Sequence, residues 1–297
     1  MSGSVGDGHA AATDTGIAAS IEVLRGPTLE KAGFRHGFST RRGGVSDGPF
    51  ASLNLGVASA PGEADPLERI MENRRRFGHA VTGEDLPWAL SRQVHGAEVH
   101  WSEGAVADPR DLERLPIADA IVGRESGRLL SVRTADCLPI LLGCSRSGLA
   151  AAVHAGWRGL VVGTIPAALD TMIAHGASRD AIVAAIGPAI SVAHYEVGEE
   201  VIEAFRKAGL EPAHRSKPRS APRSAPRSAP RSADETGTRP HLDLAATACA
   251  MLGRCGVDEG RVDVFVRCTF AEPDRFFSYR RDGARSGRLA AVIEPRG

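Results

Sequence analysis

Three short polar segments of the sequence each hold one side chain that could bind a metal ion: His95, Cys137 and His154. One cysteine and two histidines form a borderline-soft donor set that suits zinc. Three protein ligands leave the fourth tetrahedral position for water or substrate, which is typical of a catalytic zinc site, whereas a structural site needs a fourth ligand. No Cys-x-x-Cys or His-x-x-x-His spacing supplies one. The segments are Ser91–Gly96, Thr134–Pro139 and Val153–Gly159.

Turn-forming residues at 145–148 predict a hairpin that brings two of these ligands together. Counting back along both arms puts Cys137 nearly opposite His154, and facing residues of an antiparallel pair have Cβ atoms about 4.5–5.5 Å apart. His95 then enters from the end of another strand. A zinc ion would lower the pKa of its bound water towards about 7, and Asp136 would serve as general base or orient the ligands. We therefore predict Asp136, Cys137 and His154 as the catalytic residues.

Two other kinds of chemistry fit the same side chains. Copper has the higher intrinsic affinity and could replace zinc, and a His₂Cys set resembles a blue-copper centre. A multicopper oxidase also needs many further histidines, commonly in His-x-His pairs, but the ten histidines form no such pair. Without a metal, Cys137 would be the nucleophile of a hydrolase and His154 its base. His36, His100 and His194 are alternative ligands, and a single buried histidine or cysteine is often only a core residue.

Helices and strands that alternate along the chain must position these residues. Short apolar runs predict strands, and apolar residues at helical spacing predict helices. Asp65, Pro66 and Glu68 have the pattern of an N-cap, a first-turn proline and a capping box, so a helix begins there. Strands joined partly by hairpins and partly by helices predict a mixed sheet and an α/β or α+β fold. The predicted strands are Leu129–Val132, Leu138–Leu142, Leu149–His154, Val262–Val266, Phe276–Arg280 and Leu289–Ile293, and further helices are predicted at Val161–Ala174, Val197–Ala208 and Leu242–Leu252.

One compact domain, residues 21–297, is predicted to follow a disordered tail at 1–20 that is rich in Gly, Ala, Ser and Thr. An irregular insertion is predicted at about 212–238, where the unit Pro-Arg-Ser-Ala recurs without an apolar residue larger than Ala or Pro. Such a segment cannot bury enough surface to offset its ordering entropy, so we expect it to be exposed. A tolerated loop expansion is favoured over a site for an anionic partner.

The overall composition excludes several classes of function. The 297 residues include 36 Lys and Arg and 36 Asp and Glu, whereas proteins that bind nucleic acids or membrane surfaces usually carry a basic excess. The five cysteines are an odd number without a Cys-x-x-Cys pair, and neither a secretory signal nor a membrane-spanning stretch is visible. We therefore expect a cytoplasmic enzyme with free thiols that acts on a small molecule, with no nucleic-acid or membrane partner and with its oligomeric state unassigned.

Ordered motifs extend along nearly the whole chain after the tail: His36–Ser46, Ser52–Gly56, Asn73–Arg74, Gln93–Gly96, Ala135–Cys137, His154–Gly159, Ile186–Ile190, Tyr195–Gly198, Cys268–Phe270, Phe277–Gly283 and Gly287–Arg288. Together they resemble the YfiH-like family, also called the laccase-domain or polyphenol-oxidase-like family. The resemblance implies a single-domain, layered α/β/β/α sandwich of the type shared with cytotoxic necrotizing factor. It also implies that His95, Cys137 and His154 bind zinc. One departure from the family is His194, which stands where members often carry cysteine.

The resemblance further implies an enzyme that acts on purine nucleosides. The reactions are phosphorolysis of adenosine, inosine or methylthioadenosine to the base and ribose 1-phosphate, and deamination of adenosine; older descriptions call the family multicopper phenol oxidases. Zinc hydroxide can attack C6 of adenine, although the usual His-x-Glu and Pro-Cys-x-x-Cys signature of zinc deaminases is absent. Phosphorolysis needs an anion site, for which Arg41, Arg74 and Arg158 are candidates because arginine binds phosphate in bidentate fashion. Asn54, in a matched motif, is the fourth predicted substrate-binding residue.

Overall fold

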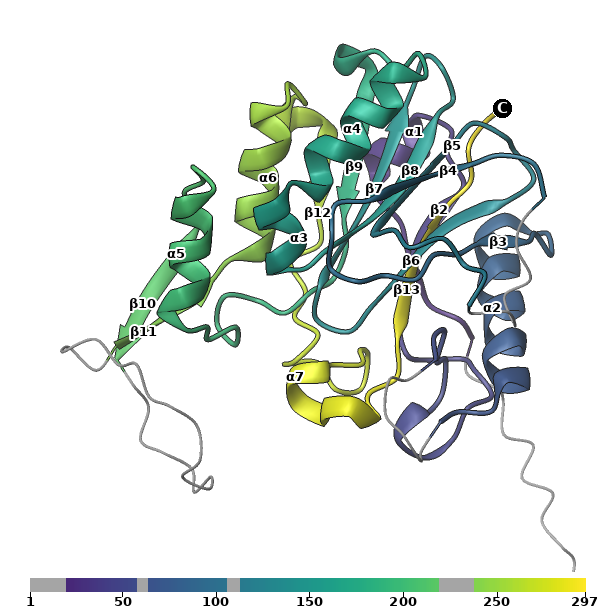
Figure 1. Ribbon diagram of the computed structural model, residues 1–297. Helices are drawn as coiled ribbons and strands as arrows, with labels where there is room; N and C mark the ends of the chain where they lie inside the picture. The colour runs from purple at the N-terminus through teal and green to yellow at the C-terminus, as the bar shows by residue number, and fades with distance from the viewer. Residues whose placement is uncertain (1–19, 58–63, 106–112, 219–237) are drawn as a thin grey trace, which may run out of the picture.

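Two β-sheets lie face to face between two layers of helices in the computed structural model, which describes residues 20–57, 64–105, 113–218 and 238–297 (Figure 1). This arrangement confirms the predicted mixed α/β class and the layered sandwich. The predicted tail, except for Ser20, lies outside the described residues, as does the part of the predicted insertion at 219–237.

The larger sheet is mixed and has the strand order β12-β9-β7-β8-β5-β4. β12 is parallel to β9 and β4 is parallel to β5, whereas the other neighbours are antiparallel. Every residue of β7 is buried, because this strand is covered on both faces, and its sequence is accordingly almost uninterrupted in apolar character. The strands are β4 (Val99–Ser102), β5 (Ala120–Gly123), β7 (Leu138–Cys144), β8 (Ala150–Ala155), β9 (Ile182–Ile186) and β12 (Val262–Val264).

The smaller sheet has five strands in the order β1-β2-β13-β6-β3. β3 is parallel to β6, and the remaining neighbours are antiparallel. Its central strands β13 and β6 pair over five residues, from Leu289 opposite Thr134 to Ile293 opposite Leu130. The strands are β1 (Val23–Leu24), β2 (His36–Ser39), β3 (Trp88–Ala89), β6 (Leu129–Thr134) and β13 (Leu289–Ile293).

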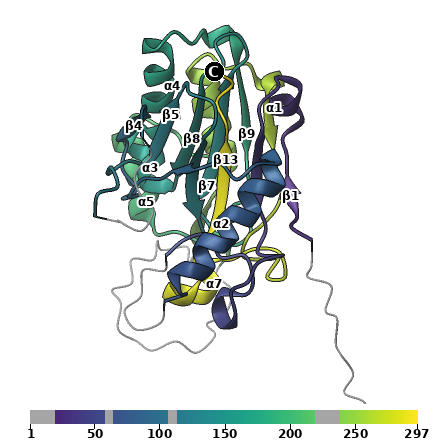
Figure 2. The same ribbon diagram turned by 90° about the vertical axis from the view of Figure 1, so that its right-hand side faces the viewer.

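Alternate residues of the central strands face two different cores, as the period of two in a strand requires. Leu141 of β7 packs between the sheets with Val132 and Ile293 of the smaller sheet. Its neighbours Ile140 and Leu142 face the outer side, where α4 and α6 cover the larger sheet. Helix α2 covers the outer face of the smaller sheet (Figure 2). The helices are α1 (Pro27–Lys31), α2 (Leu67–Thr82), α3 (Trp157–Val162), α4 (Thr164–Ala174), α5 (Glu199–Lys207), α6 (Leu244–Arg254) and α7 (Tyr279–Asp282).

The turn between β6 and β7 crosses from one sheet to the other. β6 ends at Thr134 in the smaller sheet, and β7 begins at Leu138 in the larger sheet. Residues 135–137 therefore lie at an end of the sandwich, between the last residue of a strand in one sheet and the first residue of a strand in the other. This turn is the feature of the fold that positions the site described below.

Several predicted elements agree with the structure. The predicted strand Leu289–Ile293 coincides with β13, and the hairpin at residues 145–148 joins β7 and β8 as predicted. The helix predicted at Val161–Ala174 is divided into α3 and α4, because Gly163 adopts a left-handed φ of 87° and ends α3.

Two predictions about polar and aromatic residues are wrong. Helix α2 begins at Leu67 with Pro66 as its N-cap, whereas the Asp65 carboxylate accepts hydrogen bonds from Ser46 and Asn54. The predicted strand Phe276–Arg280 is not a strand. Its two phenylalanines are fully buried in a loop that leads into α7, so their apolar character reflects core packing rather than sheet pairing.

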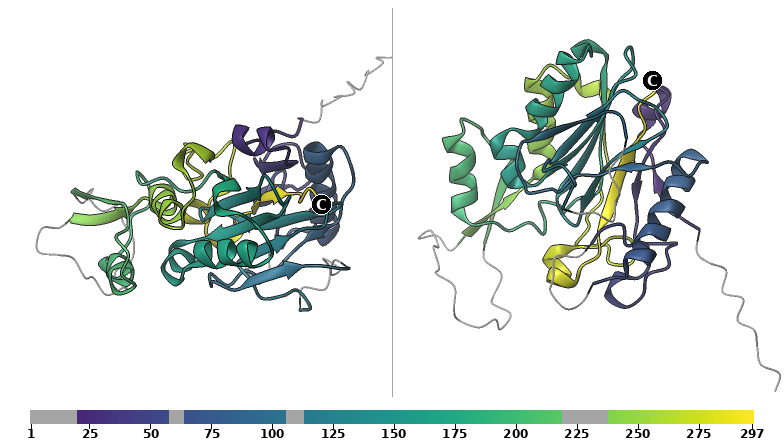
Figure 3. Two further views of the ribbon diagram at one scale, coloured as in Figure 1. Left: turned by 90° about the horizontal axis from the view of Figure 1, so that it is seen from above. Right: turned by 45° about the vertical axis from the view of Figure 1, so that its right-hand side comes forward.

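Part of the predicted irregular insertion is regular. Residues His214–Pro218 form β10, which pairs in antiparallel register with β11 (Thr238–Leu242). The hairpin and α5 project from one side of the molecule (Figure 3). Backbone pairing provides the hydrogen bonds here, so the strand forms although its sequence lacks the apolar alternation on which a prediction would rely.

Candidate metal site and substrate pocket

Three segments converge at the end of the sandwich and bring together His95, Cys137 and His154. His95 lies in the loop after β3, Cys137 lies in the crossing turn before β7, and His154 lies near the end of β8. Their ligand atoms all lie within 4.8 Å of one another, and Cys137 Sγ is 3.7 Å from His95 Nε2. Zinc bonds of about 2.3 Å to sulfur and about 2.0 Å to nitrogen at a tetrahedral angle separate the two donors by roughly 3.5 Å. The donor set and its spacing therefore fit a single zinc ion with an open fourth position.

The strand register differs from the predicted one by two residues. Pro139 pairs with His154, so Cys137 lies beside Gly156 rather than opposite the histidine. A shift of two keeps both ligands on the same face of the sheet, which is why they still meet. A Cβ atom at Gly156 would lie 2.8 Å from Cys137 Sγ and 3.1 Å from His95 Cδ2. Glycine is therefore required at this position so that the two ligands can approach each other.

Asp119 links the two histidine segments and was not predicted from the sequence. Its fully buried carboxylate accepts the Nδ1 hydrogen of His154 at 2.8 Å and the backbone N–H of His95 at 2.9 Å. It also accepts the backbone N–H groups of Gly96 at 2.7 Å and Val94 at 3.1 Å. Because Nδ1 of His154 is occupied, Nε2 faces the metal position. The sequence signal is an aspartate that directly precedes a fully buried apolar strand, where a lone carboxylate needs partners.

The protonation states of Cys137 and His154 depend on each other. Burial raises the pKa of the Cys137 thiol, but the adjacent His154 and His95 outweigh burial and lower it to about 6. Burial lowers the pKa of His154, but the Cys137 sulfur and Asp119 outweigh it and raise the value to about 9. These pKa values favour a thiolate beside an imidazolium at neutral pH, and a metal ion that binds both side chains would displace the imidazolium proton.

Asp136 is held away from the metal position by residues near the C-terminus. Its carboxylate accepts hydrogen bonds from Thr269 Oγ1 at 2.5 Å, Ser278 Oγ at 3.0 Å and the backbone N–H of Arg280 at 2.6 Å. The Asp136 backbone has a left-handed φ of 89°, and His95 has a φ of 62°. Such backbone conformations cost about 1–3 kcal/mol each for residues other than glycine and are often found at functional sites. These contacts favour the orienting role among the two that the sequence suggested for Asp136.

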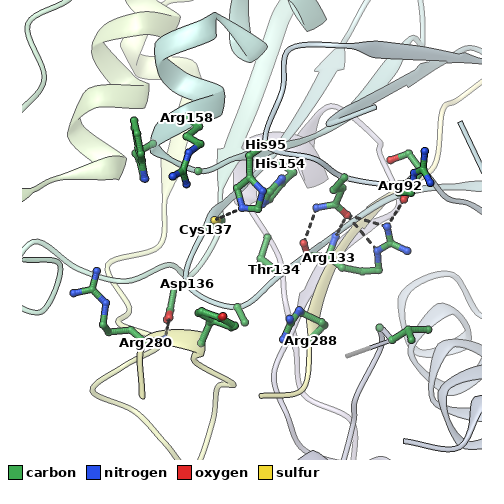
Figure 4. Close-up of a pocket in the computed structure, with 18 of the residues that line it drawn as sticks. Arg92, His95, Arg133, Thr134, Asp136, Cys137, His154, Arg158, Arg280 and Arg288 are labelled. Carbon is green, nitrogen blue, oxygen red and sulfur yellow. Dashed lines mark hydrogen bonds between the residues drawn. The ribbon is translucent and has the colours of Figure 1, made fainter. Parts of the chain in front are cut away.

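A cavity of about 740 Å³ opens over the metal ligands. Figure 4 shows the ligands in its middle, with Arg158 and Arg280 on one side and Arg133 and Arg288 on the other. The guanidinium group of Arg158 stacks on Trp157 at 4.4 Å, and that of Arg280 lies 5.1 Å from the ring of Tyr195. The cavity thus combines aromatic faces with an excess of cationic groups.

Only one of the four predicted substrate-binding residues, Arg158, lines this cavity. Arg41 binds the carbonyl oxygens of Ala51 and Pro273, and Arg74 binds that of Leu55, so both arginines hold loops together. The buried amide of Asn54 donates to Asp65 and accepts from the backbone N–H of Arg288. The structure therefore gives Arg41, Asn54 and Arg74 contacts in the wall of the site rather than in the cavity.

The alternative histidine ligands lie elsewhere. His36 is fully buried and contacts the backbone of Gly26 and Phe34. His194 Nδ1 lies 3.5 Å from Cys268 Sγ, and its ring stacks on Phe270. All five cysteines are free. Among the described residues, His95, Cys137 and His154 are the single group of three or more His, Cys, Asp or Glu side chains placed to share one ion.

The fold and the site together define an α/β/β/α sandwich with an open three-ligand metal site beneath a cationic cavity. Residues 35–296 match the family model described as multi-copper polyphenol oxidoreductase laccase. The chain belongs to this laccase-like, YfiH-type family, as the resemblance predicted. Relatives in the family are named after enzymatic activities, and this chain is an enzyme of the same kind.

Curated relatives and solved structures agree with this assignment. The purine nucleoside phosphorylase of Deinococcus radiodurans is 37% identical over 276 residues, which cover 93% of this chain and 94% of that protein. Adenosine deaminase RL5 from an unknown prokaryotic organism is 36% identical over 265 residues, covering 86% and 92%. The crystal structure of YlmD from Geobacillus stearothermophilus has a TM-score of 0.74 and 30% identity, covering 93% of this chain and 96% of that chain. In the described parts of the chain, no helix has the length and apolar character needed to cross a membrane.

Proposed function

We propose that this chain is a zinc-dependent purine nucleoside enzyme that catalyses phosphorolysis of adenosine, inosine or methylthioadenosine and also deaminates adenosine. The observation that carries the proposal is the open His/Cys/His group at the base of a cavity of about 740 Å³. Cavities of about 300–1,000 Å³ are typical of small-molecule sites. The names of the relatives from D. radiodurans and the unknown prokaryote supply the two reactions.

Zinc, when bound, supplies a Lewis acid that promotes deprotonation of water or polarises a substrate atom. His154 keeps Nε2 directed at the ion because its Nδ1 hydrogen is donated to Asp119. Cys137 contributes a thiolate, and Asp136 positions the crossing turn through its bonds to Thr269 and Ser278. Trp157 and Tyr195 line the cavity and offer aromatic faces to a purine ring.

The two reactions differ in the nucleophile. In phosphorolysis, an oxygen of hydrogen phosphate attacks C1′ of the ribose while the bond from C1′ to the purine nitrogen breaks, and the phosphate proton goes to the departing base. In deamination, the oxygen of water adds to C6 of adenine and ammonia leaves; one water proton goes to the ammonia and the other to N1. Only the first reaction needs a site for a phosphate dianion.

Metal content and product analysis test the proposal together. We expect about one zinc per chain, adenine and ribose 1-phosphate from adenosine with phosphate, and inosine from adenosine without it. Cys137→Ala should lose bound zinc and both activities, whereas Cys249→Ala, which removes a thiol on α6, should keep them. Full turnover by a Cys137→Ala protein that has lost its metal would contradict the mechanism.

Two alternative functions have different outcomes in the same assays. Stoichiometric copper with phenol oxidation and no nucleoside turnover would indicate an oxidase, although a laccase needs copper sites beyond a single three-ligand group. A metal-independent hydrolase is favoured by the thiolate–imidazolium pair, and its activity would survive a chelator. We also propose a cytoplasmic location, where reducing conditions keep Cys137 free to bind zinc.

A further inference from the structure

Two neighbouring arginines line the cavity beside the metal ligands without any acidic partner. Arg133 lies in β6, and Arg288 directly precedes the adjacent strand β13 of the smaller sheet. Both side chains pack over Gly56, where a Cβ atom would lie 2.8 Å from Arg288 Cβ and 3.4 Å from Arg133 Cδ. Among the described residues, neither guanidinium has a carboxylate within 4.0 Å. Burial, and next the charge of Arg288, lowers the pKa of Arg133 to about 10. This side of the cavity therefore carries uncompensated positive charge, which is costly where water is partly excluded.

Both guanidinium groups keep hydrogen-bond donors free. Arg133 Nε and Nη2 donate to the Gln93 side-chain oxygen at 3.2 and 3.1 Å, and Nη2 also donates to the Ser91 carbonyl. Arg133 Nη1 has no acceptor among the residues that the structure describes. Arg288 Nη1 donates to the carbonyl oxygens of Ser286 at 2.6 Å and Gly287 at 3.2 Å, whereas its Nε and Nη2 have no acceptor within the described chain. These neutral contacts fix both side chains and leave charged donors for a ligand.

A buried hydroxyl group without a partner is an independent sign of a missing ligand. Thr134 lines the same cavity between the metal ligands and Arg288 and is 2% exposed (Figure 4). In the described part of the chain, its Oγ1 has no hydrogen-bond partner. Ser91 Oγ, also on the cavity wall, is likewise buried and unpaired. Leaving a buried hydroxyl unpaired is unfavourable, so an unpaired hydroxyl in a cavity wall indicates room for a water molecule or a ligand that bonds to it.

We propose that Arg133, Arg288 and the hydroxyl group of Thr134 form a subsite for inorganic phosphate, the second substrate of phosphorolysis. This inference rests on the proposed function. Guanidinium forks bind tetrahedral oxyanions through paired charged hydrogen bonds, and a hydroxyl group donates to a further oxygen. Arg288 lines the same cavity as Cys137 and His154, so a phosphate held by Arg288 shares that cavity with the metal ligands. We therefore propose Arg133 and Arg288 as phosphate ligands in place of Arg41 and Arg74.

Steady-state kinetics of the zinc-loaded protein distinguish the role of this subsite from that of the rest of the cavity, because phosphorolysis depends on phosphate and deamination does not. We expect Arg288→Met to raise the KM for phosphate by about 10- to 100-fold, because the substitution removes charged hydrogen bonds to the anion. Adenosine deamination without phosphate should fall by a smaller factor than phosphorolysis does, because only phosphorolysis uses the subsite. Arg288→Lys should recover part of the phosphate affinity, and Thr134→Val, which preserves the shape of the side chain, should raise the same KM about 3- to 10-fold.

The matched control is Arg92→Met, which removes a positive charge at the exposed edge of the same cavity. It should change the KM for phosphate by less than about twofold, as expected for a screened surface charge. Calorimetric titration with inorganic phosphate, in the absence of nucleoside, should show one site per chain that Arg288→Met abolishes and Arg92→Met keeps.

The outcomes distinguish the two proposals. Phosphorolysis by Arg288→Met with an unchanged KM for phosphate would refute the subsite and leave the proposed function intact. A wild-type protein that turns over no nucleoside but binds phosphate through Arg288 would refute the proposed function and leave the anion subsite intact. Binding of adenosine monophosphate in place of inorganic phosphate, with no competition by the latter, would also overturn the assignment.

Discussion

Asp119→Asn is the change that tests most directly how the metal site is held together. The Asp119 carboxylate accepts four hydrogen bonds, from His154 Nδ1 and from the backbone N–H groups of Val94, His95 and Gly96. An asparagine has one acceptor oxygen, so if this oxygen keeps the His154 and His95 bonds, its NH₂ group faces the other two donors. Two lost bonds to a charged acceptor cost about 3–6 kcal/mol of unfolding free energy.

The same substitution should weaken zinc binding without removing a ligand. Residues that orient ligating histidines typically contribute about 10- to 100-fold in metal affinity, which corresponds to roughly 1.4–2.7 kcal/mol. Competition with a chromophoric chelator measures the Kd for zinc, and thermal melts of the metal-free protein measure the loss of stability. Asp180→Asn is the control, because this carboxylate is on the surface and binds only Arg146 and Ser178 among side chains. A zinc Kd within twofold of the wild-type value would refute the role assigned to Asp119.

Three further predictions follow from the site and the insertion. Gly156→Ala should abolish stoichiometric zinc, measured by elemental analysis, because its Cβ atom would lie 2.8 Å from Cys137 Sγ; Gly253→Ala, where a Cβ atom meets nothing within 4 Å, should retain zinc. In the metal-free protein, iodoacetamide should alkylate Cys137 at a rate that levels off above about pH 7 and falls as the pH drops through about 6. Burial raises the pKa of this thiol, but the two histidines lower it to about 6, whereas burial keeps the pKa of Cys249 above its usual value, so mass mapping at pH 7 should find Cys249 largely unmodified. Replacing residues 219–237 by a two-residue turn should leave kcat and KM within about twofold, because Pro218 and Thr238 are direct cross-strand partners and a short turn can join them; a large loss of activity would show that the segment contributes to the site.

Residue type and spacing predicted that His95, Cys137 and His154 come together, and they predicted the mixed α/β class. Cys137 and His154 lie on the two sides of a hairpin whose turn is predicted by the sequence. The predicted strand register is wrong by two residues, but side chains on a strand alternate with a period of two, so both residues still lie on the same face of the sheet. Five strands of the two sheets (β6, β7, β8, β12 and β13) were also predicted, and continuous apolar runs such as the β7 sequence are typical of strands covered on both faces. The equally apolar β5 and β9 were not predicted.

The remaining parts of the site depend on contacts between distant segments. Asp119 acts on residues 23 to 35 positions away, and Arg133 and Arg288 meet only because β6 and β13 pair. Nothing in their local sequence separates these arginines from Arg41 and Arg74, which were predicted instead but bind backbone carbonyl groups. Long-range pairing, rather than local propensity, decides which arginines reach the cavity.

Because the crossing turn joins β6 to β7, residues of the site come from both β-sheets. His154 lies in β8 of the larger sheet and Cys137 directly precedes its strand β7, whereas Arg133 and Thr134 lie in β6 of the smaller sheet and Arg288 directly precedes its strand β13. On the two proposals made above, substitutions in one sheet are expected to alter the metal site while leaving the phosphate subsite in place, and the reverse also holds. For protein engineering, we expect a library confined to the ends of β6 and β13 to vary anion recognition without removing His95, Cys137 or His154.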